Sequence, residues 1–189
     1  MLARFGGAMM AMQVGLAAAG NAVIGNRCSY DIYVWSVGSG SGSNAIHVPA
    51  RSQHIEPFQG TSMSLKISKS EQCEKPTQFE YSIVNNQLWY DISFVDCANG
   101  EDASNCPGHA EGLAMSGSNT ACRSVECAAG QYCPTTAYYV PQPLVQLGLA
   151  EPVYTCQGAG TNMDLYMTMC SSQPSLRRSI AGRLSVDIN

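Results

Sequence analysis

Two carboxylates on neighbouring predicted strands are the residues of this chain whose type and spacing could do chemistry. Residues 79–84 and 88–95 alternate apolar and polar side chains, and the two asparagines at 85–86 favour a tight turn between them. Glu80 and Asp91 each lie on the more polar face of their strand, so pairing of the strands could bring them close together. Two carboxylates at a defined separation can hydrolyse a glycosidic bond when one of them has a raised pKa.

Two further side chains near this pair could help to bind a sugar. Trp89 shares its strand face with Asp91, which makes it the best-placed aromatic ring for stacking on a sugar. Asp96 lies five residues after Asp91, so a continuing strand would place it on the opposite face. It reaches the pair only if the strand ends or bulges near Val95. The other aromatic candidates, most of which we expect in the core, are Trp35, Tyr33, Tyr90, Tyr138 and Tyr139.

The composition indicates one extracellular domain. The chain has 189 residues, enough for a single domain with its own core, and its net charge of -4 argues against nucleic acid as the main partner. After Arg4, the apolar run at residues 8–19 ends in an A-x-A site, the pattern of a signal peptide that spans residues 1–19. This run is too short to cross a bilayer, so we expect a secreted protein with no membrane anchor.

Nine cysteines follow that segment, a density typical of a disulfide framework in a secreted chain. Because the number is odd, one thiol stays unpaired or pairs with another chain. The C-x4-C and C-x5-C spacings differ from those of zinc sites, and no histidine stands at ligand spacing to them. We therefore expect neither a metal nor a cofactor.

Short strands separated by turn residues indicate an all-β sandwich or barrel. Besides the hairpin, the predicted strands are Cys28–Val37, Ile46–Val48, Gln53–Ile55, Thr61–Ser68, Val153–Cys156 and Asp164–Met169. We expect the last two to be joined by a turn at 157–160. Residues 97–143 show no sustained period and are expected to form loops held by disulfides, and residues 171–189 a mobile tail.

Five motifs in a fixed order resemble those of the thaumatin-like proteins. They are Asn26-Arg27-Cys28-Ser29-Tyr30, Leu65-Lys66-Ile67 before Cys73, Tyr90-Asp91-Ile92-Ser93-Phe94-Val95-Asp96, Cys122-Arg123-Ser124-Val125-Glu126-Cys127-Ala128-Ala129, and Tyr154-Thr155-Cys156 with Met169-Cys170. Most of the family's cysteine-rich second domain is missing here, so the chain is similar to the short fungal secreted antigens. The resemblance implies a small, disulfide-stapled thaumatin-like β-sandwich over residues 20–170.

The resemblance also implies a disulfide pairing, because family members join their first strand to their last. Four disulfides result: Cys28–Cys170 and Cys122–Cys156 from the family, and Cys97–Cys106 and Cys127–Cys133 as the economical local pairs. Cys73 is left free, since the loop that carries its partner in the family is missing. The Cys28–Cys170 bond closes the longest loop and should stabilise the fold most.

Antifungal members of the family carry an acidic cleft made of one arginine, one glutamate and three aspartates. Glu80 matches the glutamate, and Asp91 and Asp96 match two of the aspartates. Ser70 occupies the arginine position, with Lys69 beside it, and the third aspartate lies in the missing region. Because the second wall of the cleft is also missing, we expect water to reach the carboxylates and their pKa shifts to be small.

The sequence leaves three functions open. The first is a monomeric, non-catalytic module that binds β-1,3-glucan, another cell-wall polysaccharide or a host component through Glu80, Asp91, Asp96 and Trp89. The second is a weak endo-β-1,3-glucanase that uses Glu80 and Asp91 as acid and base. The third is a secreted antigen or virulence effector that acts through protein partners. Solvated surface carboxylates without a ligand are the plain alternative to all three.

Overall fold

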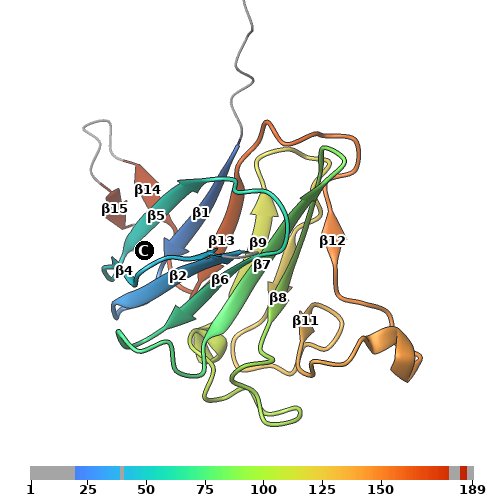
Figure 1. The fold of residues 1–189 in the computed structure, drawn as a ribbon. Helices are drawn as coiled ribbons and strands as arrows, with labels where there is room; N and C mark the ends of the chain where they lie inside the picture. The colour runs from blue at the N-terminus through green and yellow to red at the C-terminus, as the bar shows by residue number, and fades with distance from the viewer. Residues whose placement is uncertain (1–19, 39–40, 179–183, 187–189) are drawn as a thin grey trace, which may run out of the picture.

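The fold is a sandwich of two twisted β-sheets that pack face to face (Figure 1). The computed structural model describes residues 20–38, 41–178 and 184–186. The predicted signal peptide, residues 1–19, lies outside these ranges. An all-β sandwich of small size is therefore confirmed for the part of the chain that the structure describes.

The smaller sheet has five strands in the order β10-β9-β13-β1-β5. Their bounds are β1 Asn21–Asn26, β5 Ser52–Pro57, β9 Leu113–Gly117, β10 Val125–Cys127 and β13 Leu165–Met169. β1 pairs with β13 in parallel, whereas the other neighbours are antiparallel. Strand alternation turns Ala22 and Ile24 toward the core and Val23 and Gly25 toward the outer face.

The larger sheet runs in the order β11-β8-β7-β6-β2-β3, with β12 added to β8 and β4 to β2. Its bounds are β2 Ile32–Gly38, β3 Ser41–Gly42, β4 Ile46–Val48, β6 Met63–Ser68, β7 Thr77–Val84, β8 Gln87–Ser93, β11 Ala137–Tyr138 and β12 Tyr154–Thr155. Asn85 and Asn86 both adopt positive φ, 51° and 58°, as the tightest hairpin turns require. The predicted hairpin of residues 79–84 and 88–95 is thereby confirmed as β7–β8.

Apolar side chains from the inner faces of both sheets fill the space between them. The fully buried ones include Ile24, Ile32, Leu65, Ile67, Phe79, Tyr81, Leu88, Tyr90, Ile92, Leu113 and Met115. The alternation that buries this set leaves the partner residues of the same strands on the outer faces. Both outer faces therefore carry side chains that are free to meet ligands.

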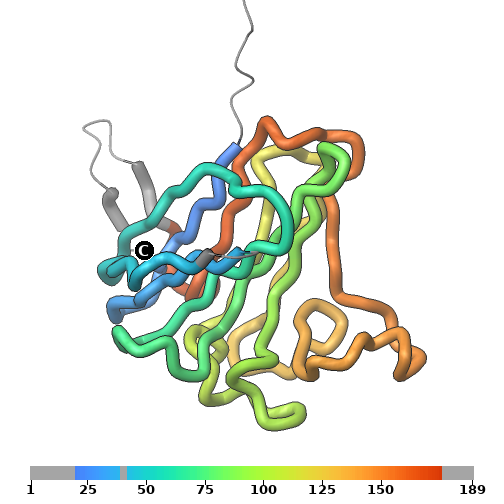
Figure 2. The backbone as a smooth tube through the Cα atoms, viewed as in Figure 1, coloured from blue at the N-terminus to red at the C-terminus, as the bar shows by residue number. Residues whose placement is uncertain are grey.

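Between β11 and β12, which both pair with β8, the chain makes a long excursion. This excursion contains the short 3-10 helix η2, Leu144–Leu147. Figures 1 and 2 show this segment projecting from the body of the sandwich at the lower right. A second 3-10 turn, η1, spans His109–Glu111. Beyond the last cysteine, β14 Leu176–Arg178 pairs with β15 Leu184–Val186 in a separate two-stranded ribbon, which the sequence did not predict.

All four predicted disulfides are present, and Cys73 is free and exposed. Cys28 follows β1 and Cys170 follows β13, so this bond fastens the two parallel strands at their ends. Cys122–Cys156 joins the segment after β9 to the segment after β12 and so links the two sheets.

Some predicted elements differ from the structure. Residues 97–143 are not only loops, because they contain β9, β10 and β11. The segments at 153–156 and 164–169 form no hairpin: β12 pairs with β8 and β13 with β1 and β9. β1 itself was not predicted, since its main partner β13 is distant in sequence and leaves no local pattern.

The strand predicted to begin at Cys28 begins instead at Ile32. The side chain of Asn26 causes this delay, because its amide donates to the carbonyls of Tyr30 and Val48 at 3.0 and 3.1 Å, and its oxygen accepts from Cys28 N–H at 3.1 Å. These bonds hold a corner between β1 and β2.

Candidate functional site

The β7–β8 register places Glu80 directly opposite Asp91 on the outer face of the larger sheet. Ser64 of β6 stands opposite Glu80 on the other side. Directly opposed residues in an antiparallel pair have Cβ atoms about 5 Å apart, which brings two carboxyl groups into contact. The sequence-predicted pair is therefore assembled by the tight turn at 85–86.

Burial changes the ionisation of this pair. Burial first, and then the charge of Glu80, raises the pKa of Asp91 to about 8. Burial also raises the pKa of Glu80, which hydrogen bonds from Asp91 and Ser64 and the charge of Lys66 partly counteract. Asp91 therefore holds the proton at neutral pH and donates it to Glu80, so that the pair carries one negative charge. The expectation of small pKa shifts was wrong.

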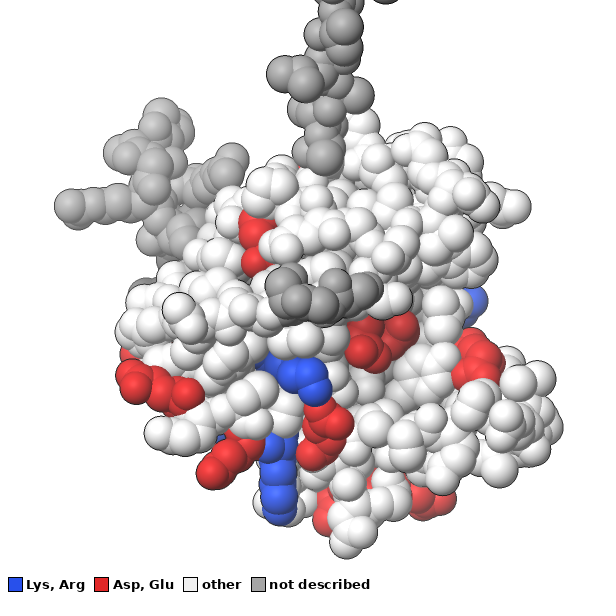
Figure 3. Space-filling model, viewed as in Figure 1, with Lys and Arg blue, Asp and Glu red and all other residues white. Residues whose placement is uncertain are grey.

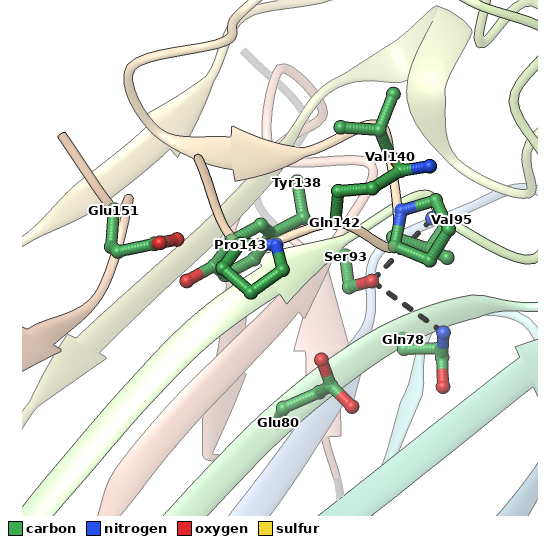
Figure 4. A pocket seen from close by; sticks show the side chains of 10 residues that line it. Gln78, Glu80, Ser93, Val95, Tyr138, Val140, Gln142, Pro143 and Glu151 are labelled. Carbon is green, nitrogen blue, oxygen red and sulfur yellow. Dashed lines mark hydrogen bonds between the residues drawn. The ribbon is translucent and has the colours of Figure 1, made fainter. Parts of the chain in front are cut away.

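The reason for that error is a wall that the sequence did not predict. The excursion between β11 and β12 folds along β8 and closes one side of a hollow of about 450 Å³. The wall contributes Tyr138, Val140, Pro141, Gln142, Pro143 and Glu151 (Figure 4). These residues take the place of the missing second domain and keep part of the water away from the carboxylates.

Glu151 stabilises this wall through two contacts within it. Its Oε1 accepts the backbone N–H of Val145 at 3.1 Å, which fixes the start of η2. Its carboxylate also interacts with the hydroxyl of Tyr138, and both contacts hold the pKa of Glu151 below its usual value. The only sign of this in the sequence was the Pro-rich run at 141–143, which marks an irregular segment without saying where it packs.

The floor of the hollow is polar and ordered. Ser93 Oγ accepts the side-chain N–H of Gln78 at 3.5 Å and the backbone N–H of Val95 at 3.4 Å (Figure 4). Both Gln78 and Ser93 are buried, at 6% and 2% exposure. This floor positions hydrogen-bonding groups beside Glu80 at little further entropic cost.

A second hollow of about 280 Å³ adjoins the first and shares Glu80 with it. Its lining comprises Ser62, Met63, Glu80, Tyr81, Ser82, Trp89, Asp91 and Val153. We call the two hollows together the acidic groove. From Ser93 to Trp89 it follows β8 over four residues, or about 14 Å.

Trp89 stands where the sequence predicted, on the same face as Asp91, and 39% of it is exposed. Asp91 Oδ1 beside it is buried and has no hydrogen-bond partner among the described residues. A buried acceptor without a partner costs free energy until a donor reaches it. The groove thus offers an open aromatic surface and, next to it, an open acceptor to the same ligand.

Asp96 lies near Glu80 but lines neither hollow of the groove. β8 ends at Ser93, so the chain turns before Asp96, and the condition set by the sequence analysis is met. Lys66 Nζ pairs with Asp96 Oδ2 at 2.5 Å beside the groove, and the charges of both residues act on Glu80. Figure 3 shows acidic side chains in the hollow between the sheet and the projecting segment, with basic ones beside them.

The remaining aromatic candidates divide three ways, and Tyr33 and Trp35 stay half-buried on β2, outside both the groove and the core. Tyr138 lines the groove, whereas Tyr90 and Tyr139 are buried at 0% and 8% exposure. Lys69 lies over the ring of Tyr30, 4.4 Å from its centroid, so that the cation of the groove is Lys66 instead. Lys66 was part of a family motif in the sequence, but its place beside the carboxylates was not predicted.

The described residues hold neither a candidate metal cluster nor a candidate membrane-spanning helix. Among them, no three His, Cys, Asp or Glu side chains are arranged to hold a metal ion. No helix within the same ranges is both long enough and apolar enough to cross a membrane.

Comparison with known proteins identifies one matching family model, Bys1, the Blastomyces yeast-phase-specific protein, over residues 9–171. The chain is 32% identical over 126 residues to the secreted thaumatin-like protein calA of Emericella nidulans, covering 65% of this chain and 70% of that protein. It is 27% identical over 156 residues to the antigenic thaumatin-like protein of Arthroderma benhamiae, covering 80% and 71%.

Among solved structures, the protein elicitor MoHrip2 of Magnaporthe oryzae has a similar fold. Its TM-score is 0.62 at 21% sequence identity, with 80% of this chain and 99% of that chain covered. At this identity the likeness concerns the fold alone. It supports the assignment of the two-sheet architecture to one recurring fold.

Proposed function

The chain belongs to the Bys1 family and is a secreted thaumatin-like protein, and from that premise we propose that it binds an uncharged cell-wall polysaccharide in the acidic groove without cleaving it. The observation that carries the proposal is Asp91 Oδ1, buried without a partner beside the exposed ring of Trp89. A sugar hydroxyl would satisfy the oxygen, and the sugar ring would cover the indole.

The shape and charge of the groove support a polymer of this class. An open channel of about 14 Å along a strand accommodates an extended chain better than a single small molecule. The charge that Glu80 and Asp91 share, together with that of Glu151, would repel a polyanion, whereas Lys66 neutralises Asp96. β-1,3-Glucan is the first polysaccharide to test, because the resemblance relates this groove to the acidic cleft of antifungal family members.

Hydrolysis is the weaker alternative, because Glu80 and Asp91 stand directly opposite each other and contact each other side by side. Retaining and inverting glycosidases hold theirs about 5–5.5 Å or about 6.5–9.5 Å apart, leaving room for the sugar or a water. Glu80 and Asp91 instead share a hydrogen bond. Such a pair binds hydroxyl groups well but leaves no space between its members for a reacting carbon.

The test is a calorimetric titration of the mature protein with β-1,3-glucan oligomers, with released reducing sugar measured in the same sample. We expect saturable binding without sugar release. Trp89→Ala should weaken binding about tenfold. Asp91→Ala should also weaken it, since alanine removes both the donor to Glu80 and the oxygen offered to the ligand.

The matched control is Tyr166→Ala, because Tyr166 is 39% exposed, like Trp89, but lies on the other sheet. It should leave glucan affinity unchanged. Equal affinity of wild type and a Trp89→Ala, Asp91→Ala double variant would refute binding in this groove. Sugar release that Asp91→Asn abolishes would replace the binding proposal by the glucanase.

A protein partner is a second candidate, favoured by the projecting segment. Val145, Leu147 and Leu149 are 68%, 59% and 56% exposed on and after η2. Apolar side chains grouped on a projection are typical of a contact surface. Replacing all three by serine should abolish capture of a host protein while leaving glucan affinity intact; a captured partner that still binds this variant would exclude the segment.

A further inference from the structure

Another hollow, separate from the two that form the acidic groove, lies on the outer face of the five-stranded sheet, and we call it the arginine pocket. We propose that this arginine pocket binds a uronic acid unit of an anionic polysaccharide, with Arg27 on the carboxylate and Tyr166 against the sugar ring. The pocket measures about 270 Å³. Its lining comprises Val23, Gly25, Arg27, Gln53, Ser116, Tyr166 and Thr168.

The pocket exists because a glycine stands at its centre. Gly25 of β1 pairs with Thr168 of β13 on one side and with Gln53 of β5 on the other. A Cβ placed on Gly25 would meet only the carbonyl oxygen of Met167, at 3.9 Å, so the space above it is open. The neighbouring side chains rise around this gap and form its rim.

The guanidinium of Arg27 lines the pocket without a carboxylate paired to it within the described ranges. Arg27 donates from Nη1 to the carbonyl of Ser171 at 3.4 Å, which occupies few of its five N–H donors. Within the described ranges, no carboxylate lies at ion-pair distance from Arg27. The nearby carboxylate of Glu126 accepts instead from the Ser171 hydroxyl at 3.4 Å. Burial lowers the pKa of Arg27, and no acidic neighbour counteracts it.

The remaining groups specify a sugar. Ser116 and Thr168 offer hydroxyls and Gln53 an amide, which exchange hydrogen bonds readily with sugar hydroxyls. Tyr166 presents an exposed ring against which an apolar ring face can pack. The volume is below that of pockets for drug-sized ligands and suits a single sugar ring.

The charge points to a carboxylate rather than a phosphate. One guanidinium neutralises the single charge of a uronate and pairs with its two oxygens side by side. A phosphate monoester would bring up to about two negative charges to the same single cation. The arginine pocket and the acidic groove therefore select opposite ligands on opposite faces, and this inference stands independently of glucan binding.

The test is a titration of the mature protein with a short oligouronide, followed by calorimetry and by amide chemical shifts. The matched ligand is the same oligomer with its carboxyl groups reduced to alcohols. We expect shifts at residues 23–27 and 166–168, and at least tenfold weaker binding of the reduced oligomer. Arg27→Gln should weaken oligouronide binding by a similar factor, while Trp89→Ala should leave the affinity for the oligouronide unchanged.

Gly25→Val is the second variant, because it places a side chain in the pocket at a position with no positive φ, where a Cβ meets no close contact. It should fold and lose the oligouronide, which keeps the proposal decidable if Arg27→Gln does not fold. Equal binding of both oligomers, unchanged binding by Gly25→Val, or the absence of shifts would overturn the proposal. Inorganic phosphate that binds as tightly as the oligouronide would overturn the assignment to a sugar.

Discussion

The acidic groove and the arginine pocket use the same construction and reach opposite electrostatic states. In both, paired strands align side chains of one face in register, and neighbouring strands supply the floor. In the groove two like charges are opposed and partly buried, so that a proton remains on Asp91. In the pocket a single cation stands alone over a glycine, with its charge unneutralised.

The difference between them lies in what borders each site. The groove has a wall, the excursion from Tyr138 to Val153, which removes water and strengthens the interaction between Glu80 and Asp91. The pocket has no such wall and depends on the absence of a side chain at Gly25. The groove should therefore respond most to protonation, and the pocket to volume and charge.

The largest expected effect is a loss of stability, which should affect the strands of the arginine pocket more than those of the acidic groove. Replacing Cys28 and Cys170 together by alanine should lower the free energy of unfolding by up to about 5 kcal/mol, because the bond closes a loop of 142 residues. Since it fastens β1 to β13, hydrogen exchange should accelerate there more than in β7 and β8. Denaturant unfolding and amide exchange measure both effects.

Its control is the Cys97→Ala, Cys106→Ala pair, whose bond spans only nine residues. This pair should cost about half as much and leave exchange in β1 unchanged. Uniform acceleration across both sheets in the first variant would contradict the view that the disulfide supports the pocket more than the groove.

The next effect concerns pH and the groove alone. Because the folded pKa of Asp91 is raised from 3.8 to about 8, its contribution to stability is complete at low pH and is lost as the pH rises between these values. Asp91→Asn should remove this loss, flattening the profile by a few kcal/mol at most. Unfolding free energies of wild type and variant across this range provide the measurement.

Arg27→Gln is the control, since it alters the pocket and should leave the shape of that profile unchanged. A wild-type stability that does not fall between pH 3.8 and about 8 would show that Asp91 is already ionised in the folded protein. The shared proton, and with it the account of the groove, would then be wrong.

Local signals explain why one site was predicted and the other was not. Glu80 and Asp91 are separated by a two-residue turn, so alternation and turn chemistry fix their register directly. Arg27 and Tyr166 meet only through the parallel pairing of β1 with β13, which no local period reveals. The disulfide Cys28–Cys170 was the one expectation that joined these segments.

The wall of the acidic groove was also not predictable, because no local sequence pattern marks where it packs. Tyr138 and Glu151 come together through an excursion that has neither a helical nor a strand period. Its residues pack against β8 because β11 and β12 both add to that strand, at different points along it. From sequence, the loss of the second domain indicated an open cleft, whereas the short excursion restores a boundary.

The smallest expected effect is the salt dependence of binding, which should differ between the charged arginine pocket and the acidic groove. Raising the salt concentration should weaken oligouronide binding about two- to fivefold, because one partly exposed ion pair is screened. Glucan binding should stay constant, since it joins an uncharged ligand to hydrogen-bonding groups. Parallel titrations of one protein sample with both ligands measure the two responses under identical conditions. Loss of glucan affinity with salt would mean that the groove recognises charge, and salt-independent oligouronide binding would remove Arg27 from the contact.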